Sequence, residues 1–292
     1  TNIQYTEPIG ENSNMLINYQ ASTSNDNSKQ YTHAFSYLEN LYSVLDTSLS
    51  NVYEKKYYTQ SGGIGYRYQK NKLNFTTSLN YNISKLISEE TYPEHYSMEK
   101  SFYSFNPSLM LRYNITRDQN IHFNYRTSNN APSIDKLQNI VDNSNTSQLS
   151  IGNPNLKQDY KHNLNLRYSI VDLKTMQSFF VMLSGSYANN YIANNIYLAN
   201  TDTTINNIFL AKGVQLTRPE NMDGYFNIRS FVSYGYMLDF IKSNLNFNLS
   251  YSYSKTPSII NNAKNFSKSS NYSGGIVISS NISENLDFTI MS

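Results

Sequence analysis

The sequence predicts an all-β fold, in which antiparallel strands form a segment of a transmembrane β-barrel. Three observations predict it. Apolar and polar residues alternate with a period of two along most of the chain, short polar turns alternate strictly with long connections, and the arginines within strands fall on the polar parity. The period of 3.6 residues that marks an amphipathic helix is almost absent.

Composition excludes several other classes of protein. Of the 292 residues, 39% are hydrophobic and 15% are charged, against roughly 45–50% and 25% in typical soluble domains. Disordered chains are poor in aromatic residues and carry high net charge, whereas this chain has 27 Tyr, 14 Phe and a formal net charge of +2. That charge, without a block of Lys or Arg, provides no basic patch for nucleic acid. The absence of Cys excludes disulfides and thiolate metal sites.

The strands follow from the alternation, taken in chain order. Within 160–170, Leu164, Leu166 and Tyr168 share one parity, while Asn165 and Arg167 share the other. Similar alternation covers 15–21, 64–68, 73–83, 109–115, 121–125, 179–187, 226–238 and 245–253. With the remaining segments this predicts about eleven strands, the last of them cut off at the end of the chain.

The connections between strands are of two kinds. Short polar turns are predicted at 7–12, 69–72, 116–120, 172–175, 239–243 and 281–285. Long segments lie between them, at roughly 23–48, 88–99, 128–158, 190–221 and 256–267. One short helical turn is predicted within 131–140, beginning at Pro132 or Ser133. Because strands joined by short turns run antiparallel, all the long segments fall at one end of the sheet.

Two architectures show such alternation: a soluble sandwich or barrel with a protein core, and a transmembrane barrel with its apolar face in lipid. The strand 245–253, tilted by about 40°, would span about 23 Å of height, which matches the apolar band of an outer-membrane barrel. A soluble sandwich has no reason to sort its loops by length. Tyr takes the place of the missing Trp in the predicted aromatic girdles. These features favour contact with lipid.

Two sets of residues are candidates for ligand contact. A lipid-facing Arg costs about 2–4 kcal/mol at the bilayer midplane, so arginines on the polar parity are expected in a wet lumen. They would form a track for an anionic ligand, or they would pair with acids of a plug and solvate the interior. Aromatic residues of the long loops are the second set, because loops on a rigid scaffold carry recognition. The candidates are Arg67, Arg112, Arg126, Arg167 and Arg229 in the lumen, and Tyr191, Tyr197 and Phe209 in the loops.

An acidic segment is the candidate for metal binding. Glu89, Glu90, Glu94 and His95 lie in one predicted loop and offer carboxylate and imidazole ligands. Their spacing imposes no coordination geometry, and the alternative is a solvated polar loop. We predict no metal site and no cofactor. Because the four histidines are dispersed and no Ser has a G-x-S-x-G setting, we also predict no enzymatic activity.

Several segments carry a family resemblance: "YTEPIGEN", "GGIGYRYQKNKLNF", "LSIGNPNLKQDYKHNLNLRY", "KGVQLTRPENMDGYFNIRSF" and "NYSGGIVISSNISENLDFTI". With "SIDKLQNIVDNSN", they resemble the β-barrel region of TonB-dependent-receptor-like outer membrane proteins of the Bacteroidota. The resemblance covers nearly the whole chain. The "NPNLK" turn is shared widely among TonB-dependent receptors, and the "QLTRPENMDGY" block points more narrowly to this barrel family.

The resemblance implies a barrel of about 22 strands, plugged in its lumen and preceded in the chain by a plug domain. Such proteins import nutrients such as metal chelates, glycans or peptides, driven by the TonB complex of the inner membrane. Residues 1–292 are therefore expected to be a partial outer-membrane barrel domain, with the plug domain and the terminal strands outside it. The alternative is a surface-binding or scaffold barrel without TonB coupling.

Overall fold

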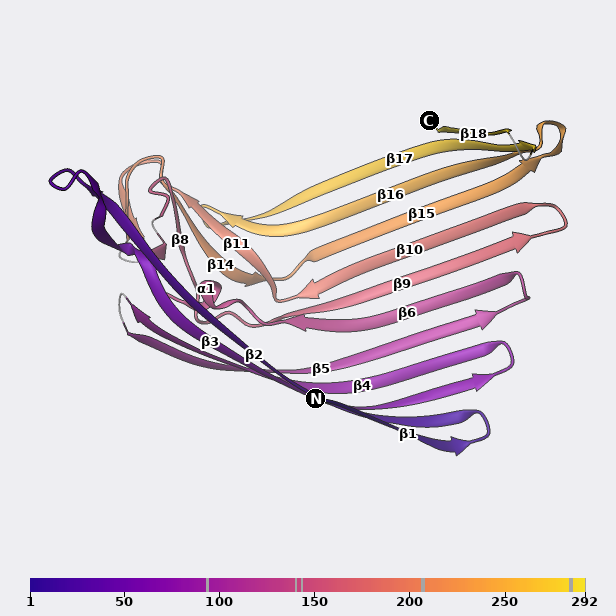
Figure 1. Cartoon of the computed structure of the whole chain (residues 1–292), viewed down its shortest axis with the longest axis horizontal. Helices are drawn as coiled ribbons and strands as arrows, with labels where there is room; N and C mark the ends of the chain where they lie inside the picture. The colour runs from indigo at the N-terminus through magenta and orange to yellow at the C-terminus, as the bar shows by residue number, and fades with distance from the viewer. Residues whose placement is uncertain (93–94, 140, 143, 206–207, 284–285, 292) are drawn as a thin grey trace.

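A curved antiparallel sheet forms most of the computed structural model, which describes residues 1–292 apart from 93–94, 140, 143, 206–207, 284–285 and 292 (Figure 1). Twelve of its described strands follow one another in chain order and form what we call the wall. They are β1 (Asn2–Gly10), β2 (Ser13–Ser36), β3 (Leu41–Lys70), β4 (Leu73–Tyr92), β5 (Tyr96–Asn114), β6 (Gln119–Asn130), β9 (Asp159–Asp172), β10 (Gln177–Asn189), β15 (Tyr225–Leu238), β16 (Ser243–Ile260), β17 (Ala263–Ser283) and β18 (Leu286–Met291).

The wall is an open sheet. Among the described residues, β1 pairs only with β2 and β18 pairs only with β17. The alternation predicts about eleven strands, whereas the described wall has one more. Within the part of the chain that the structure describes, no helix is long and apolar enough to cross a membrane.

Short turns join the wall strands at one end, which we call the turn end (right in Figure 1). The turns predicted at 7–12, 69–72, 116–120, 172–175 and 239–243 are confirmed, and the last prediction, 281–285, includes residues outside the described part. The side chain of Asp172 accepts hydrogen bonds from the backbone N–H groups of Lys174 (2.8 Å) and Thr175 (3.4 Å), which stabilises its turn.

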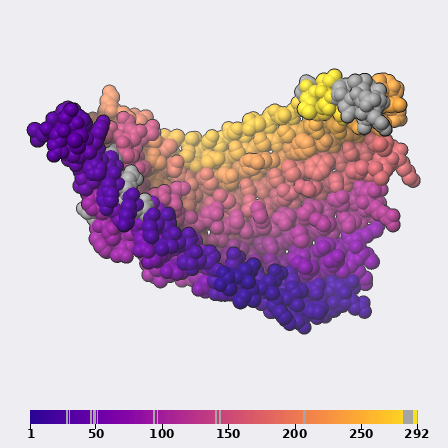
Figure 2. Space-filling model, viewed as in Figure 1, coloured from indigo at the N-terminus to yellow at the C-terminus, as the bar shows by residue number. Residues whose placement is uncertain are grey.

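The opposite end of the wall is the loop end. There the prediction of a long loop is wrong for three of the five segments. Segments 23–48, 88–99 and 256–267 are mostly continuations of paired strands. The hairpin of β2 and β3 stays paired as far as Ser36 and Leu41, and it stands out at the loop end in Figure 2. Beyond the predicted membrane-spanning part, both faces of a hairpin meet water, so the sequence loses the alternation by which a strand is detected.

The other two long connections fold into a compact unit, which we call the cap (131–158 and 190–222). The predicted helical turn is confirmed as α1, which begins directly after Ser133. A small sheet is built from the remaining segments, in the order β11, β14, β8, β7, and β11 joins the wall through two residue pairs with β16. The cap elements are α1 (Ile134–Leu137), β7 (Val141–Asp142), β8 (Gln148–Ile151), β11 (Tyr191–Leu198), β12 (Thr203–Ile205), β13 (Ile208–Leu210) and β14 (Gln215–Met222).

Two apolar clusters hold the cap in place. The first joins it to the wall, because Ile134, Leu137 and Leu156 of the cap pack on Leu86 of β4 and Phe102 of β5. The second lies within the cap itself and contains Ile151, Ala199, Leu210 and Leu216. Full burial of one such Leu or Ile stabilises a fold by about 1.5–3 kcal/mol, so the cap is a folded part of the structure.

The two faces of the wall differ in chemistry, as the alternation predicts. On one face Ile17 pairs with Ile64, which pairs with Leu79, and all three side chains are exposed. On the other face, Asn18 donates a hydrogen bond to Asn80 across Gly63. A β-carbon at Gly63 would lie 1.9 Å from Oδ1 of Asn80, so the amide pair requires glycine there.

Candidate functional site

The polar face of the wall is hollowed between β6, β9, β10 and β15 into a cavity of about 590 Å³, the lumenal cavity. Three of the predicted arginines line it together: Arg126, Arg167 and Arg229. Their cross-strand partners are polar, since Arg126 faces Asn163 and Arg229 faces Ser184. The strand alternation alone therefore brings these charges to one surface.

The fourth arginine lies beside this cavity, and the fifth lies apart from it. Arg112 of β5 is paired with His122, and His122 is paired in turn with Arg167, so the three form one row across adjacent strands. Arg67 lies two strands further along the sheet, where it faces Asn14 and Thr76. None of the five arginines forms an ion pair with a described carboxylate. The lumenal surface is thus positively charged.

A second cavity of about 590 Å³, the mouth cavity, lies at the loop end between the wall and the cap. Lys55, Glu90, Asp135, Lys136 and Asp142 bring both signs of charge to it. Only Glu90 was a candidate from sequence. The other four charged residues lie on segments that come together only when the cap folds. No local sequence pattern predicts that they share a cavity.

Glu90 has an environment unlike that of its neighbours in the acidic segment. Its side chain is only 6% exposed and accepts a hydrogen bond from the side-chain amide of Gln138 at 3.2 Å. It lies beyond the membrane-spanning part of β4, and burial raises the pKa of its carboxyl group above the ordinary value.

The described metal-ligand candidates, Glu89, Glu90 and His95, do not converge on one point. His95 lies against Glu89, with 3.3 Å between Nε2 and Oε1, on an exposed surface. Glu90 follows Glu89 in strand β4 and so faces the opposite side of the sheet, while Glu94 lies outside the described residues. Among the described residues no group of three His, Asp or Glu side chains is placed to hold a metal ion.

The two loop tyrosines belong to the cap, where one packs against the wall and the other packs inside the cap. Tyr191 stacks on Tyr225 with ring centroids 4.6 Å apart, and burial is the main cause that raises the pKa of its hydroxyl. Tyr197 packs against the apolar cluster inside the cap. Phe209, by contrast, is 65% exposed.

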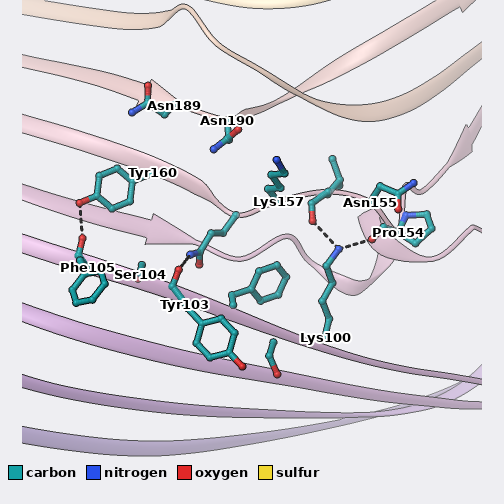
Figure 3. A pocket seen from close by; sticks show the side chains of 14 residues that line it. Lys100, Tyr103, Ser104, Phe105, Pro154, Asn155, Lys157, Tyr160, Asn189 and Asn190 are labelled. Atoms are coloured by element: carbon teal, nitrogen blue, oxygen red, sulfur yellow. Dashed lines mark hydrogen bonds between the residues drawn. The ribbon is translucent and has the colours of Figure 1, made fainter.

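The wall itself splits at the loop end, beside β5. The pairing of β5 with β6 ends at Ser108, next to Pro107, which has no backbone N–H to donate. Beyond this point a crevice of about 840 Å³ separates β5 from segment 154–160 (Figure 3). Side chains close part of it, because Gln158 donates to the carbonyl of Tyr103 (2.6 Å) and Tyr160 donates to that of Phe105 (2.6 Å).

Lys100 anchors the cap to β5 across this crevice. Figure 3 shows its ammonium group between the backbone carbonyls of Pro154 and Leu156, and the bond to Leu156 is 2.7 Å long. The partial burial of this side chain lowers the pKa of the ammonium group. The cation thus holds the turn that the sequence marks with "NPNLK" against the wall.

The "GNPNLK" segment (152–157) is where the parts of the cap meet. A β-carbon at Gly152 would lie 2.1 Å from the carbonyl oxygen of Gln138, so only glycine allows this approach to the end of α1. Asn153 donates from its side chain to the carbonyl of Pro219 (3.0 Å). Asn221 binds the backbone of Lys157 on both its N–H and its C=O. Two segments that carry the resemblance, "GNPNLK" and "QLTRPENMDGY", therefore contact each other directly.

An antiparallel wall with an apolar outer face, a polar hollow face and all its long connections at one end defines the class of transmembrane β-barrels. The chain belongs to the outer membrane protein beta-barrel family, whose model matches residues 1–292, and it is located in the outer membrane. In such barrels the short turns face the periplasm and the longer loops face the exterior. No curated protein sequence matches the chain.

Solved structures with the same fold include receptors and transporters. The Serratia marcescens hemophore receptor HasR is similar with a TM-score of 0.61 and 10% identity, over 99% of this chain and 50% of that one. The copper transporter OprC gives 0.60 and 7%, over 99% and 47%. The FrpB iron transporter from Neisseria meningitidis gives 0.56 and 10%, over 99% and 41%. The chain therefore spans about half the length of these proteins or less.

Proposed function

We propose that this chain is part of the barrel of a TonB-dependent receptor of the Bacteroidota, which takes up a nutrient ligand across the outer membrane. The observation that carries the proposal is the lumenal cavity with three arginines, in a wall whose loop end is covered by a folded cap. A plug domain and the remaining strands of the barrel belong to the rest of the protein, and coupling to the TonB complex runs through that part.

The ligand enters at the loop end, through the mouth cavity, and then meets the lumenal arginines. Hydrogen bonds to charged groups are worth about 1.5–3 kcal/mol each, and Arg binds carboxylate and phosphate groups with paired N–H donors. The proposed ligand is accordingly anionic, and Arg112, Arg126, Arg167 and Arg229 form its track. Arg67 lies on the same face outside this row and contributes less.

The test is uptake by cells that carry the full-length protein. Growth on media limited in turn for ferric chelates, glycans or peptides identifies the nutrient whose use requires the gene. On that nutrient, replacement of Arg126, Arg167 and Arg229 by Gln is expected to lower uptake at least tenfold. The control is Arg117→Gln, which removes the same charge from an exposed position at the turn end.

Two other results would redirect the assignment. Unchanged uptake, together with a lower melting temperature of the full-length receptor, would mean that the arginines pair with acids of the plug. Ligand binding at the cell surface that leads to no uptake, with or without an intact TonB complex, would favour the alternative function of a surface-binding or scaffold barrel.

A further inference from the structure

Three lysines lie together on the outward face of β16 and β17, just beyond the lipid-facing residues. Lys255 and Lys268 are direct cross-strand partners, and like charges in that arrangement repel. Lys264 lies four residues from Lys268 on the same strand and hence on the same face. The three like charges make this part of the outward face positively charged, and such a patch attracts anionic groups.

An aromatic ring lies at the centre of this group. The ammonium group of Lys255 lies 4.1 Å from the ring centroid of Phe266, and Phe266 stands between Lys264 and Lys268 on the same face of β17. The ring reaches across to Gly224, where a β-carbon would lie 3.0 Å from it. Lys255 therefore lies over the ring of Phe266, and Lys264 and Lys268 flank that ring in sequence on the same face of β17.

No acidic residue on these strands neutralises the lysines. Between residues 225 and 283 the only carboxylate is that of Asp239, and it lies at the turn end of the wall, in η1 (Asp239–Ile241). None of the three lysines forms an ion pair with a carboxylate in the described part of the chain. Asp223, which directly precedes Gly224, accepts a hydrogen bond from the backbone N–H of Asn190. The lysine group is therefore open to an anionic partner from outside the chain.

The position of the lysines along the strand indicates where that charge comes from. The outward residues of β16 run from Leu245 to Tyr253, and a strand of about 9–11 tilted residues crosses the hydrocarbon core. Lys255 is the next outward residue toward the exterior. Below it, Tyr251 and Tyr272 have ring centroids 4.8 Å apart, and Tyr272 is 78% exposed, as expected for the aromatic girdle at the membrane surface.

We propose that Lys255, Lys264 and Lys268 bind the phosphate group of a lipid headgroup in the outer leaflet around the barrel. The apolar band continues directly into the lysine group, so a lipid whose chains lie along Leu249 and Tyr251 presents its headgroup to the three ammonium groups. Lys binds phosphate as a compact point charge, and a juxtamembrane Lys attracts anionic lipid.

The test uses the full-length protein in detergent, with phosphatidic acid and phosphatidylcholine as probes and native mass spectrometry as the readout of retained lipid. Wild type is expected to retain phosphatidic acid in preference to phosphatidylcholine. Replacement of all three lysines by Gln is expected to weaken that retention by about fivefold for each lysine. A matched control, Lys70→Gln with Lys174→Gln and Lys242→Gln, removes three exposed charges from three separate turns at the turn end and is expected to weaken retention far less.

Three results decide the proposal. A triple Arg variant keeps the charge and should retain phosphatidic acid, which covers the case in which the Gln variant does not fold. Retention that is equal in wild type and the Gln variant overturns the proposal. Displacement of phosphatidic acid by inorganic phosphate, but not by sodium chloride of the same ionic strength, would show that the lysines bind free phosphate. That result overturns the proposal of a lipid headgroup. Nutrient uptake is independent of all three results.

Discussion

The side-chain amide of Asn221 holds the backbone of Lys157 from both sides: its Oδ1 accepts from the N–H (2.7 Å) and its Nδ2 donates to the C=O (2.9 Å). The same Nδ2 also donates to the carbonyl of Asn190 at 2.8 Å. One residue thereby joins the two halves of the cap and also binds the residue that directly follows β10.

Asn221→Ala is expected to loosen segment 152–158. The substitution leaves the N–H and C=O of Lys157 and the C=O of Asn190 without these partners, and a typical hydrogen bond contributes about 0.5–1.5 kcal/mol to stability. Hydrogen exchange of this segment in the full-length protein should rise accordingly. The control is Asn271→Ala, which removes only a 3.5 Å bond on an exposed strand. Equal exchange in the two variants would show that Asn221 does not hold the cap.

Gly152→Ala is expected to displace α1. The new β-carbon would meet two backbone carbonyl oxygens, those of Gln138 and Asp135, and backbone cannot move aside as a side chain can. Such overpacking typically costs about 1–3 kcal/mol. Limited proteolysis within 131–158 measures the effect. Gly62→Ala serves as the control, because a β-carbon there has no heavy atom within 4 Å. Similar cleavage rates in the two variants would show that the close approach of Gly152 to the end of α1 does not stabilise the cap.

Lys100→Met is expected to separate the "NPNLK" turn from β5. Met keeps most of the apolar stem but cannot donate to the carbonyls of Pro154 and Leu156. Faster hydrogen exchange at 153–158, with no change in the turn-end strands, is the expected signature. Lys100→Arg keeps donors at this position and should restore most of the protection; if Met and Arg behave alike, the anchor is not the ammonium group.

Glu90→Gln is expected to stabilise the cap at neutral pH. Because burial raises the pKa of Glu90 in the folded state, the folded protein holds this proton more tightly than the unfolded chain. The resulting stability is fully present below the ordinary pKa of 4.5 and is lost as the pH rises through the folded pKa. Gln remains uncharged and keeps an acceptor for Gln138.

The melting temperature of the full-length protein in detergent measures this at two pH values. The variant should exceed wild type at pH 7, by about 2–4 °C for each kcal/mol recovered, and should match it at pH 4. If the variant and wild type differ in melting temperature by the same amount at both pH values, the titration of Glu90 is not the cause of the stabilisation.

The sequence predicts the wall far better than it predicts the cap. Leu164, Leu166 and Tyr168 alternate with polar residues because one face contacts lipid and the other contacts water. Each spanning strand shows this alternation in its own sequence. Above the membrane the contrast disappears, so the hairpin of β2 and β3 resembles a polar loop in sequence. The period-two pattern also explains why Arg126, Arg167 and Arg229 were identifiable as one lumenal set.

The contacts of the cap depend on residues far apart in the chain, and local patterns do not determine them. Asn153 reaches Pro219, and Lys157 reaches Asn221, over separations that no turn or periodicity specifies. Glu90 illustrates the same limit. Its charge made it a metal candidate beside His95, whereas its place on the inner face of β4 gives it Gln138 as its partner.

The central claim, that one face of this wall contacts lipid and the other lines a wet lumen, is tested most directly on β9. The chain has no Cys, so spin labels at Leu166→Cys and Asn165→Cys in the full-length protein report on single positions in a bilayer. The account predicts that a lipid-soluble relaxant reaches the label at 166 and that a water-soluble relaxant reaches the one at 165. The reverse pattern, or equal access of the water-soluble relaxant to both, would contradict it.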